Sequence, residues 1–321
     1  MTCPILLTGA TGFVGKALLS SLIDQGSEVI AVVRGSSAQV DPRARLGRIV
    51  SLDEKTEWRD CLDGIQIVIH SAARVHVMAE TDLDPLAAFR RVNVQGTLNL
   101  ARQAAAAGVK RFIFVSSIKV NGEGTSMGRP YRADDPPAPV DPYGISKMEA
   151  EQGLRSLANQ TGMEVVIIRP VLVYGPGVRA NFLSMMRWLD RGVPLPFGAI
   201  KNRRSLVSLD NLVDLINVCI THPAAANQTF LVSDGEDLST TVLLQRMGHA
   251  LGKTTRLVPV PSVLLELTAI LLGKRALSRR ICGSLQVDIE KNRLLLGWTP
   301  RVRLDHALSM TALHYQEQAR K

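Results

Sequence analysis

Residues 5–15 read Ile-Leu-Leu-Thr-Gly-Ala-Thr-Gly-Phe-Val-Gly, an apolar run followed directly by three evenly spaced glycines. The apolar run predicts a buried strand, and the amphipathic stretch that begins at Val14 predicts a helix. In a strand-turn-helix unit Gly9 permits the tight turn, Gly12 lets the backbone approach a pyrophosphate, and Gly15 lets helix and strand pack closely. The free N–H groups at the start of the helix favour phosphate. The stretch therefore predicts a dinucleotide-binding site.

The segments that follow predict a doubly wound parallel sheet, the α/β arrangement of the Rossmann type. Apolar strands are expected at residues 28–34, 45–50, 65–73 and 111–117, with helical patterns between them. In such sheets, ligands bind outside the carboxyl ends of the strands. Residues at those ends are therefore the first candidates for binding.

The end of the second strand bears on the choice between NAD and NADP. NAD-binding sheets usually place Asp or Glu there to bind the ribose 2′-hydroxyl. Here the sequence is Val33-Arg34-Gly35-Ser36-Ser37, without a carboxylate. A guanidinium and two hydroxyls suit a 2′-phosphate, so Arg34, Ser36 and Ser37 favour NADP. The alternative is that Arg34 only stacks on the adenine.

Two further strand ends supply candidate contacts. Ser51-Leu52 follows the third strand and suits a backbone contact to adenine. Ala72-Ala73 ends the next strand, where small residues allow a dinucleotide to approach. Beyond them, Arg74 and His76 are candidates for contact with the substrate.

A long helix is expected over residues 85–107, and it places Asn93 among apolar and small residues. A buried amide needs hydrogen-bond partners. Asn93 is therefore either a structural clamp or part of a proton path.

Ser117, Tyr143 and Lys147 form a chemical constellation. Ser117 ends a strand, and Tyr143 and Lys147 share one face of a helix for which Asp141 is the expected N-cap and Pro142 the first residue. A phenol has a reference pKa of roughly 10, too high for efficient proton transfer near neutrality. We expect the Lys147 ammonium and a nearby nicotinamide to lower the pKa of Tyr143, while the Ser117 hydroxyl holds the reacting oxygen.

Composition excludes several classes of protein. A chain of 321 residues that is 46% hydrophobic can bury one large or two unequal lobes. Its net charge of +9 comes with only 4% aromatic residues and no nucleic-acid motif, which favours phosphates of small molecules over nucleic acid. Neither a signal peptide nor a disulfide or metal-binding cysteine pattern is evident, so we expect a cytoplasmic protein without bound metal. The apolar run 263–272 contains Glu266 and is too short to span a bilayer; it predicts a helix on an interface or over the active site.

Taken together, these motifs resemble the extended short-chain dehydrogenases/reductases, on the branch of nucleotide-sugar epimerases, dehydratases and reductases. The resemblance covers at least residues 5–215 and implies catalytic roles for Ser117, Tyr143 and Lys147, which Asn93 helps to organise. The motifs that carry it occur in the family's order and are Thr8-Gly9-Ala10-Thr11-Gly12-Phe13-Val14-Gly15, His70-Ser71-Ala72-Ala73, Asn93-Val94-Gln95-Gly96-Thr97, Val115-Ser116-Ser117, Tyr143-Gly144-Ile145-Ser146-Lys147 and Arg169-Pro170-Val171-Leu172-Val173-Tyr174-Gly175-Pro176.

The expected cofactor site joins the strand ends to these motifs. By the resemblance, Pro170 to Leu172 would lie against the nicotinamide. The complete set expected to contact NADP(H) is Gly9, Thr11, Gly12, Phe13, Val14, Arg34, Ser36, Ser37, Ser51, Leu52, Ala72, Ala73, Arg74, Asn93, Val115, Tyr143, Lys147, Pro170 and Leu172.

The second half is expected to form a smaller substrate lobe. We place the cofactor domain at residues 1–175 and the nucleotide-sugar lobe mainly at 176–321, with a strand and helix near 200–222 returning to the first. Residues 288–298 resemble the family's last helix. Arg204 matches an arginine that binds the substrate diphosphate, although the acidic residue that usually follows it is missing, and Arg279 or Arg280 would complete the clamp. The residues expected to bind substrate are Arg74, His76, Ser116, Ser117, Asn181, Pro196, Arg204 and Arg280.

Two reactions fit these features. The NADP signal at Arg34 favours net reduction, and residues 71–78 resemble the subgroup of reductases that act on UDP-4-keto-6-deoxy-N-acetylglucosamine in bacterial surface-polysaccharide (O-antigen) synthesis. The expected product is UDP-N-acetylquinovosamine or its C4 epimer UDP-N-acetylfucosamine, and the sequence does not choose between them. The alternative is a UDP-sugar 4-epimerase that retains NAD. Family members often dimerise through the helices that would here be residues 85–107 and 143–160.

Overall fold

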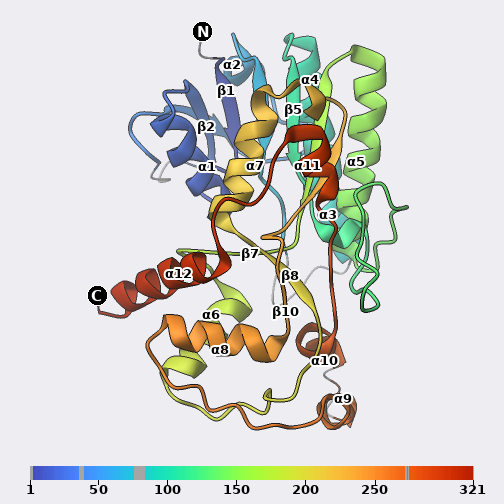
Figure 1. Cartoon of the computed structure of the whole chain (residues 1–321). Helices are drawn as coiled ribbons and strands as arrows, with labels where there is room; N and C mark the ends of the chain where they lie inside the picture. The colour runs from blue at the N-terminus through green and yellow to red at the C-terminus, as the bar shows by residue number, and fades with distance from the viewer. Residues whose placement is uncertain (1–2, 36–39, 76–83, 272, 274, 321) are drawn as a thin grey trace.

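The structure is a computed structural model that describes residues 3–35, 40–75, 84–271, 273 and 275–320, without the side chains of 275–277. Ser36, Ser37 and His76, which were predicted to bind cofactor or substrate, lie outside the described residues. Figure 1 shows a large sheet flanked by helices, with a smaller group of strands and helices below it.

The large sheet has seven strands in the order β3-β2-β1-β4-β5-β6-β9, and every neighbouring pair is parallel. This order confirms the predicted doubly wound Rossmann-type sheet. Its strands are β1 (Ile5–Thr8), β2 (Val29–Arg34), β3 (Arg45–Ile49), β4 (Ile67–His70), β5 (Arg111–Val115), β6 (Glu164–Pro170) and β9 (Thr229–Val232).

Helices cover both faces of this sheet. Ile5 and Leu7 point to a core shared with α1 and α7, whereas Leu6 points to a second core shared with α4 and α5. Because successive residues of a strand face opposite sides, a continuous apolar run buries both faces. The helices of this part are α1 (Phe13–Asp24), α2 (Arg59–Leu62), α3 (Pro85–Arg90), α4 (Thr97–Ala106), α5 (Pro142–Thr161), α7 (Leu209–Thr221) and α11 (Glu290–Leu296), with the 3₁₀ turns η2 (Ile118–Val120) and η3 (Pro223–Ala225).

The expected helix over residues 85–107 is three consecutive helical segments. Between α3 and α4 lies η1 (Arg91–Gly96), a π-helical turn that contains Asn93. Single π-turns inside helices are frequent at functional sites. The wider turn is not visible in the apolar pattern, because one inserted residue barely changes the spacing of the apolar residues.

The chain leaves the large sheet after Pro170 and enters a small sheet of order β10-β8-β7. A third core joins this sheet to the helices below it in Figure 1. The expected strand near residue 204 is β8, which lies in the small sheet, whereas α7 packs against α1 and β9 extends the large sheet. The elements of this part are β7 (Leu172–Tyr174), β8 (Arg204–Ser208), β10 (Asp237–Leu238), α6 (Ala180–Asp190), α8 (Thr240–Ala250), α9 (Ser262–Leu271), α10 (Arg275–Cys282) and α12 (Leu304–Ala319).

The C-terminal end differs from the expectation. The helix expected at 288–298 is α11, but it is followed by the longer α12, which the sequence analysis did not predict. Its residues Leu304, Ala307, Leu308 and Ala312 are buried in the third core.

Candidate functional site

The glycine turn after β1 has the shape that a dinucleotide requires. Gly9 has φ +73°, and a Cβ built there would lie 2.7 Å from the backbone nitrogen of Ala72. A Cβ on Gly15 would lie 2.0 Å from the carbonyl oxygen of Gly9, so the helix can approach the strand only because Gly15 lacks a side chain. Thr11 and Gly12 are exposed at the start of α1. The turn thus presents bare backbone and a helix N-terminus, which fits a pyrophosphate.

His70, at the end of β4, ties the strand ends together. Its Nδ1 is 2.7 Å from the Thr8 hydroxyl and its Nε2 is 2.9 Å from the Thr97 hydroxyl. Complete burial, with Lys147 nearby, lowers the pKa of His70 to about 3. The imidazole is therefore neutral at physiological pH, and Ala72-Ala73 follows it half-buried at the sheet edge.

At the end of β2, Arg34 is exposed, and a second arginine, Arg48 on the neighbouring strand β3, bonds the residue that follows it. Arg48 Nη1 donates to the carbonyl of Gly35 at 2.9 Å. Ser51 is half-buried and Leu52 is buried. The carbonyl of Leu52 packs on Gly96, where a Cβ would lie 2.9 Å away, so this loop is held against η1.

Asn93 is buried and makes three hydrogen bonds. Its Oδ1 accepts from the backbone N–H of Arg74 at 2.8 Å, and its Nδ2 donates to the Arg74 carbonyl and to Ser146 Oγ, each at 3.0 Å. Ser146 in turn donates to the carbonyl of Tyr143 at 2.8 Å. Asn93 therefore clamps the loop after β4 to the helix that carries Tyr143. Of the two roles left open for it, these bonds support the clamp.

Ser117 and Tyr143 are brought together by β5 and α5. Asp141 caps α5, as predicted, by accepting from Gly144 N at 2.7 Å, and Pro142 is the first helical residue. Burial and the charge of Asp141 raise the pKa of the half-buried Tyr143 to about 12, and a side-chain hydrogen bond with Ser117 acts in the opposite direction. Tyr143 also packs edge-on against Phe89, and the guanidinium of Arg74 lies over the same Phe89 ring.

Lys147, four residues after Tyr143 on α5, is buried. Its Nζ donates to the carbonyl of Val115 at 2.9 Å and lies 4.3 Å from the ring centre of Phe114. Burial lowers the pKa of Lys147 to about 7, while Glu151 raises it. The sequence predicted that Lys147, together with a nearby nicotinamide, would lower the pKa of Tyr143. In the protein alone the pKa of Tyr143 is raised instead, because desolvation dominates and the ammonium points at Val115.

A buried ionic network next to Ser117 was not predicted. Arg169 donates to Glu151 through Nε at 2.9 Å and Nη2 at 2.5 Å, and Ser116 donates to the same carboxylate at 2.6 Å. Arg169 Nη1 also donates to Asn121. The Ser116 hydroxyl, predicted to bind substrate, is therefore turned into this network. In the sequence, Glu151 lies four residues after Lys147 on the same helical face. This spacing is the one feature that could have indicated a buried charge here.

The predicted substrate contacts lie on several elements. Leu172 is exposed at the start of β7, directly after the buried Pro170 and Val171. Arg204, the first residue of β8, donates to the carbonyls of Arg280 at 2.9 Å and Gly283 at 3.1 Å, and its burial lowers its pKa. The structure thus brings Arg204 and Arg280 together. Asn181 at the start of α6 and Pro196 before Phe197 are both exposed.

A second polar cluster lies beyond β7. Tyr174 is buried and donates to Asp234 Oδ2 at 2.8 Å, while Asp234 Oδ1 accepts from Ser208 N and Asn211 Nδ2. This cluster fastens the small sheet to α7. Tyr174 belongs to the Arg169–Pro176 motif but had been given no role.

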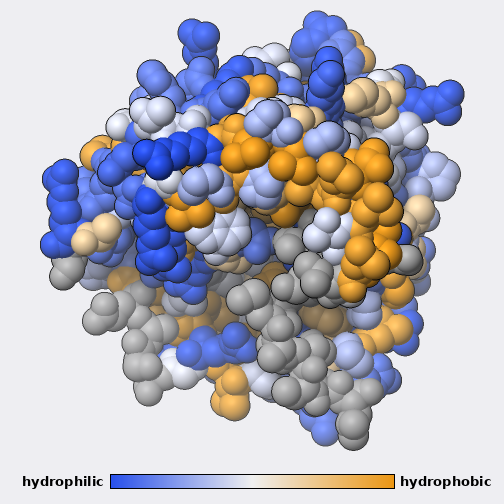
Figure 2. Space-filling view, turned by 90° about the horizontal axis from the view of Figure 1, so that it is seen from below, coloured by the Kyte–Doolittle hydropathy of each residue, from blue (hydrophilic) through white to orange (hydrophobic). Residues whose placement is uncertain are grey.

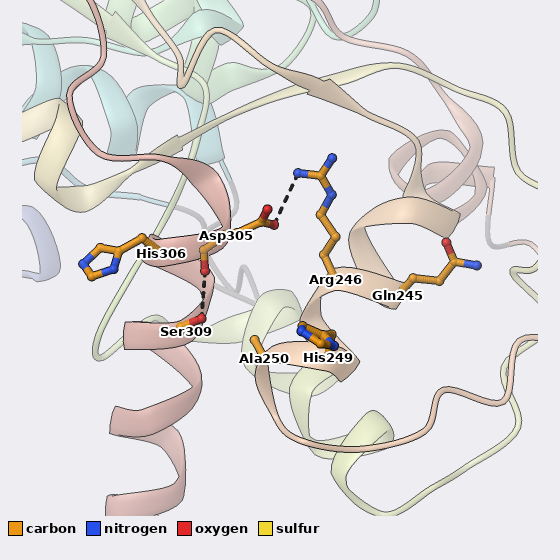
Figure 3. Close-up of a pocket in the computed structure, with 7 residues that line it drawn as sticks. All are labelled: Gln245, Arg246, His249, Ala250, Asp305, His306 and Ser309. Carbon is orange, nitrogen blue, oxygen red and sulfur yellow. Dashed lines mark hydrogen bonds and ion pairs between the residues drawn. The ribbon is translucent and has the colours of Figure 1, made fainter.

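An open groove of about 640 Å³ lies between α8 and α12. Figure 3 shows Arg246 from α8 directed at Asp305 from α12, with His249 and His306 on either side. None of the seven lining residues is among those predicted to bind cofactor or substrate. The groove is therefore separate from the Ser117–Tyr143 site.

Comparison with known proteins identifies the family. Residues 5–233 match the NAD-dependent epimerase/dehydratase family. This chain belongs to that family. The match begins at β1 and ends just after β9, so it spans the whole large sheet. In addition, no helix in the described ranges is both long and apolar enough to cross a membrane.

Individual relatives carry names from the same branch. The chain is 49% identical over 310 residues to a UDP-glucose 4-epimerase of Vibrio cholerae, covering 96% of this chain and 94% of the relative. It is 27% identical to an N-acetyl-α-D-glucosaminyl-diphospho-ditrans,octacis-undecaprenol 4-epimerase of Escherichia coli O157:H7, covering 97% and 96%. Among solved structures, MoeE5 in complex with UDP-glucose and NAD is 25% identical, with a TM-score of 0.77. The match covers 99% of this chain and 100% of MoeE5.

Proposed function

We propose that this chain is a UDP-hexose 4-epimerase that keeps its nicotinamide dinucleotide bound through each turnover. The observation that carries the proposal is the grouping of three side chains: Ser117 lies close enough to Tyr143 to lower the pKa of its phenol, and the buried Lys147 follows one turn further along α5. The bare turn at Gly9 lies at the same edge of the sheet. The high identity to the Vibrio cholerae epimerase along almost the whole chain supports this reaction over the reductase that the sequence alone favoured.

The proposed chemistry uses the three side chains in turn. When bound, the cofactor supplies a hydride acceptor and a positively charged ring beside the sugar. Tyr143 accepts the proton of the C4 hydroxyl as the sugar is oxidised and returns it to the C4 oxygen as the sugar is reduced from the other face. Ser117 holds that oxygen by a hydrogen bond. Lys147 follows Tyr143 by one helical turn, with its Nζ held on the Val115 carbonyl, and in its protonated form it would add positive charge that favours the phenolate.

We place the diphosphate of the substrate at Arg204 and Arg280. The bond from Arg204 to the Arg280 carbonyl fixes the two residues side by side. Burial of Arg204 strengthens its attraction for an anion, because fewer water molecules compete. This arrangement would anchor either C4 epimer equally, which an epimerase needs.

A second candidate is the NADPH-dependent reduction of a UDP-4-keto-6-deoxy-N-acetylhexosamine. One observation favours it: Arg34 is exposed at the end of β2, where a carboxylate is absent, and Arg48 reaches the neighbouring Gly35. Two guanidinium groups suit a 2′-phosphate. This candidate predicts that each turnover consumes one NADPH.

One experiment separates the two. The purified chain is incubated with UDP-glucose without added cofactor, and the nucleotide released by acid is assigned as NAD(H) or NADP(H). The proposal expects UDP-galactose to form while NAD(H) is recovered from the protein. Absence of UDP-galactose, together with oxidation of added NADPH by the 4-keto sugar nucleotide, would replace the epimerase with the reductase.

A further inference from the structure

Helix α9 exposes apolar side chains on one side only. Val263, Leu264, Leu267, Ile270 and Leu271 are between 43% and 86% exposed. No residue of the helix is fully buried, and its less exposed residues are Ser262, Leu265 and Ala269. The helix packs against α10.

The spacing of these residues gives the helix two distinct sides. At 3.6 residues per turn, the five exposed aliphatic residues form one continuous stripe about a third of the circumference wide. Ser262, Leu265 and Ala269 lie opposite and face the protein. Glu266 and Thr268 border the stripe, and Thr268 donates to the Leu264 carbonyl within the helix, so its hydroxyl is satisfied. The stripe is therefore an apolar ridge that faces outward. Contiguous exposed apolar surface of this kind marks interaction sites.

Exposed basic residues occur on α10, on the segment that bonds to the chain just after α10, and on the segment that precedes α9. Arg279 is exposed on α10, which contacts α9. Lys201 and Arg203 are exposed on the segment that bonds to the end of α10 through Arg203 N and Ser284 Oγ. Arg256 is exposed six residues before α9. Figure 2, which views the molecule from the side of α9 and α10, shows a continuous hydrophobic area beside strongly hydrophilic residues.

We propose that the ridge of α9 docks this protein on an anionic phospholipid surface. An interfacial helix lies in the plane of the membrane, with its apolar side in the boundary of the acyl chains and its basic surroundings at the lipid phosphates. The apolar residues of the ridge would contact the acyl chains, and the basic residues would contact the lipid phosphates. The net charge of +9 acts in the same direction at longer range.

The charges argue against a second copy of the chain as the occupant. In a symmetric dimer the same patch occurs on both sides of the interface. Packing two α9 ridges together would therefore also bring the adjoining α10 helices, each with an exposed Arg279, toward the contact. Like charges in a partly desolvated contact are unfavourable. A bilayer that carries anionic head groups satisfies the ridge and the cations together.

Vesicle flotation of the full chain tests the proposal without any substrate, so it is independent of the proposed reaction. Vesicles of phosphatidylcholine alone are compared with vesicles containing phosphatidylglycerol. The variant Leu264→Ser/Leu267→Ser removes the centre of the ridge, and Lys201→Glu/Arg203→Glu inverts two charges. Leu294→Ser/Leu313→Ser is the matched control, because both leucines are exposed on other helices, α11 and α12.

The wild-type chain should float with the anionic vesicles and roughly 10-fold less with phosphatidylcholine alone or in 0.5 M salt. Both test variants should lose most of the binding, and the control should keep it, with unchanged melting temperatures showing that all four proteins fold. Failure of the wild type to float overturns the proposal. So does a wild-type dimer in solution that Leu264→Ser/Leu267→Ser converts to a monomer, since the ridge would then be the interface between two copies.

Discussion

The side chain of Ser117 lies close enough to the phenol of Tyr143 to lower its pKa, and this approach brings the residues that follow β5 to the first turn of α5. Burial makes the phenol of the protein alone a weaker acid than free tyrosine, and Ser117 partly offsets this effect. The pKa of the Tyr143 phenol should therefore fall when a positive charge is placed beside it.

Replacing Ser117 by alanine should lower kcat by roughly 10²-fold, because the C4 oxygen loses a hydrogen bond that is needed as its charge changes. The pKa of Tyr143 should also rise, since its lowering contact is removed. The alkaline shift is read from the pH dependence of kcat. Ser117→Thr, which keeps the hydroxyl, serves as the control. Equal kcat in Ser117→Ala and wild type would exclude a catalytic role.

Gly9→Ala should destabilise the fold and abolish cofactor binding. Both φ +73° and the 2.7 Å approach to Ala72 N oppose a Cβ at this position. Gly26→Ala is the matched control, because Gly26 has φ +77° with nothing within 4 Å. The control isolates the backbone strain, about 1–2 kcal/mol. Thermal unfolding should show a larger loss for Gly9→Ala, and equal losses would mean that the close approach to Ala72 is unimportant.

Stability should fall in acid partly because of His70. Its folded pKa of about 3 lies below the unfolded value, so between pH 6.5 and 3 the unfolded chain binds the extra proton. The free energy of unfolding should therefore drop by up to about 1.4 kcal/mol per pH unit as pH decreases through this window. His70→Gln should reduce this slope, whereas the exposed His249→Gln should not. Denaturant titrations at pH 4.5 and 7 measure the free energy of unfolding of each protein. The same pH dependence in wild type, His70→Gln and His249→Gln would contradict this role of His70.

Arg169→Met should cost about 3–5 kcal/mol of stability, because it leaves the Glu151 carboxylate buried without its principal cation. The double variant Arg169→Met/Glu151→Leu should recover much of this loss. Arg155→Met is the control, since Arg155 meets the same carboxylate from solvent at 3.6 Å and should cost below about 1 kcal/mol. Chemical denaturation of the four proteins gives the comparison. A single Arg169→Met variant as stable as Arg155→Met would show that the buried pair is not strongly coupled.

Local patterns were enough to predict five strands of the large sheet, β1 to β5, whereas β6 and β9 were not predicted as strands. Continuous apolar runs with glycine or small residues at their ends gave β1, β2, β4 and β5, and Asp141-Pro142 gave the start of α5. These features depend on neighbours in the chain, which a sequence displays directly. The grouping of Ser117, Tyr143 and Lys147 at one sheet edge follows from the parallel order of the strands.

Other features depend on contacts between distant segments. The π-turn around Asn93 is set by the loop after β4 and by Ser146, neither of which a helical pattern reveals. The direction of Lys147 Nζ is decided by the carbonyl of Val115, thirty-two positions earlier. The inward turn of the Ser116 hydroxyl follows from Glu151 and Arg169, which meet only once β5, β6 and α5 have packed.

The most direct test follows the conversion of UDP-glucose to UDP-galactose by the purified chain without added cofactor, in wild type and in Tyr143→Phe. We predict that the wild type reaches the same mixture of the two sugars from either side, and that Tyr143→Phe is slower by roughly 10²-fold or more while it retains its nucleotide. A Tyr143→Phe variant that interconverts the sugars at the wild-type rate would contradict the account.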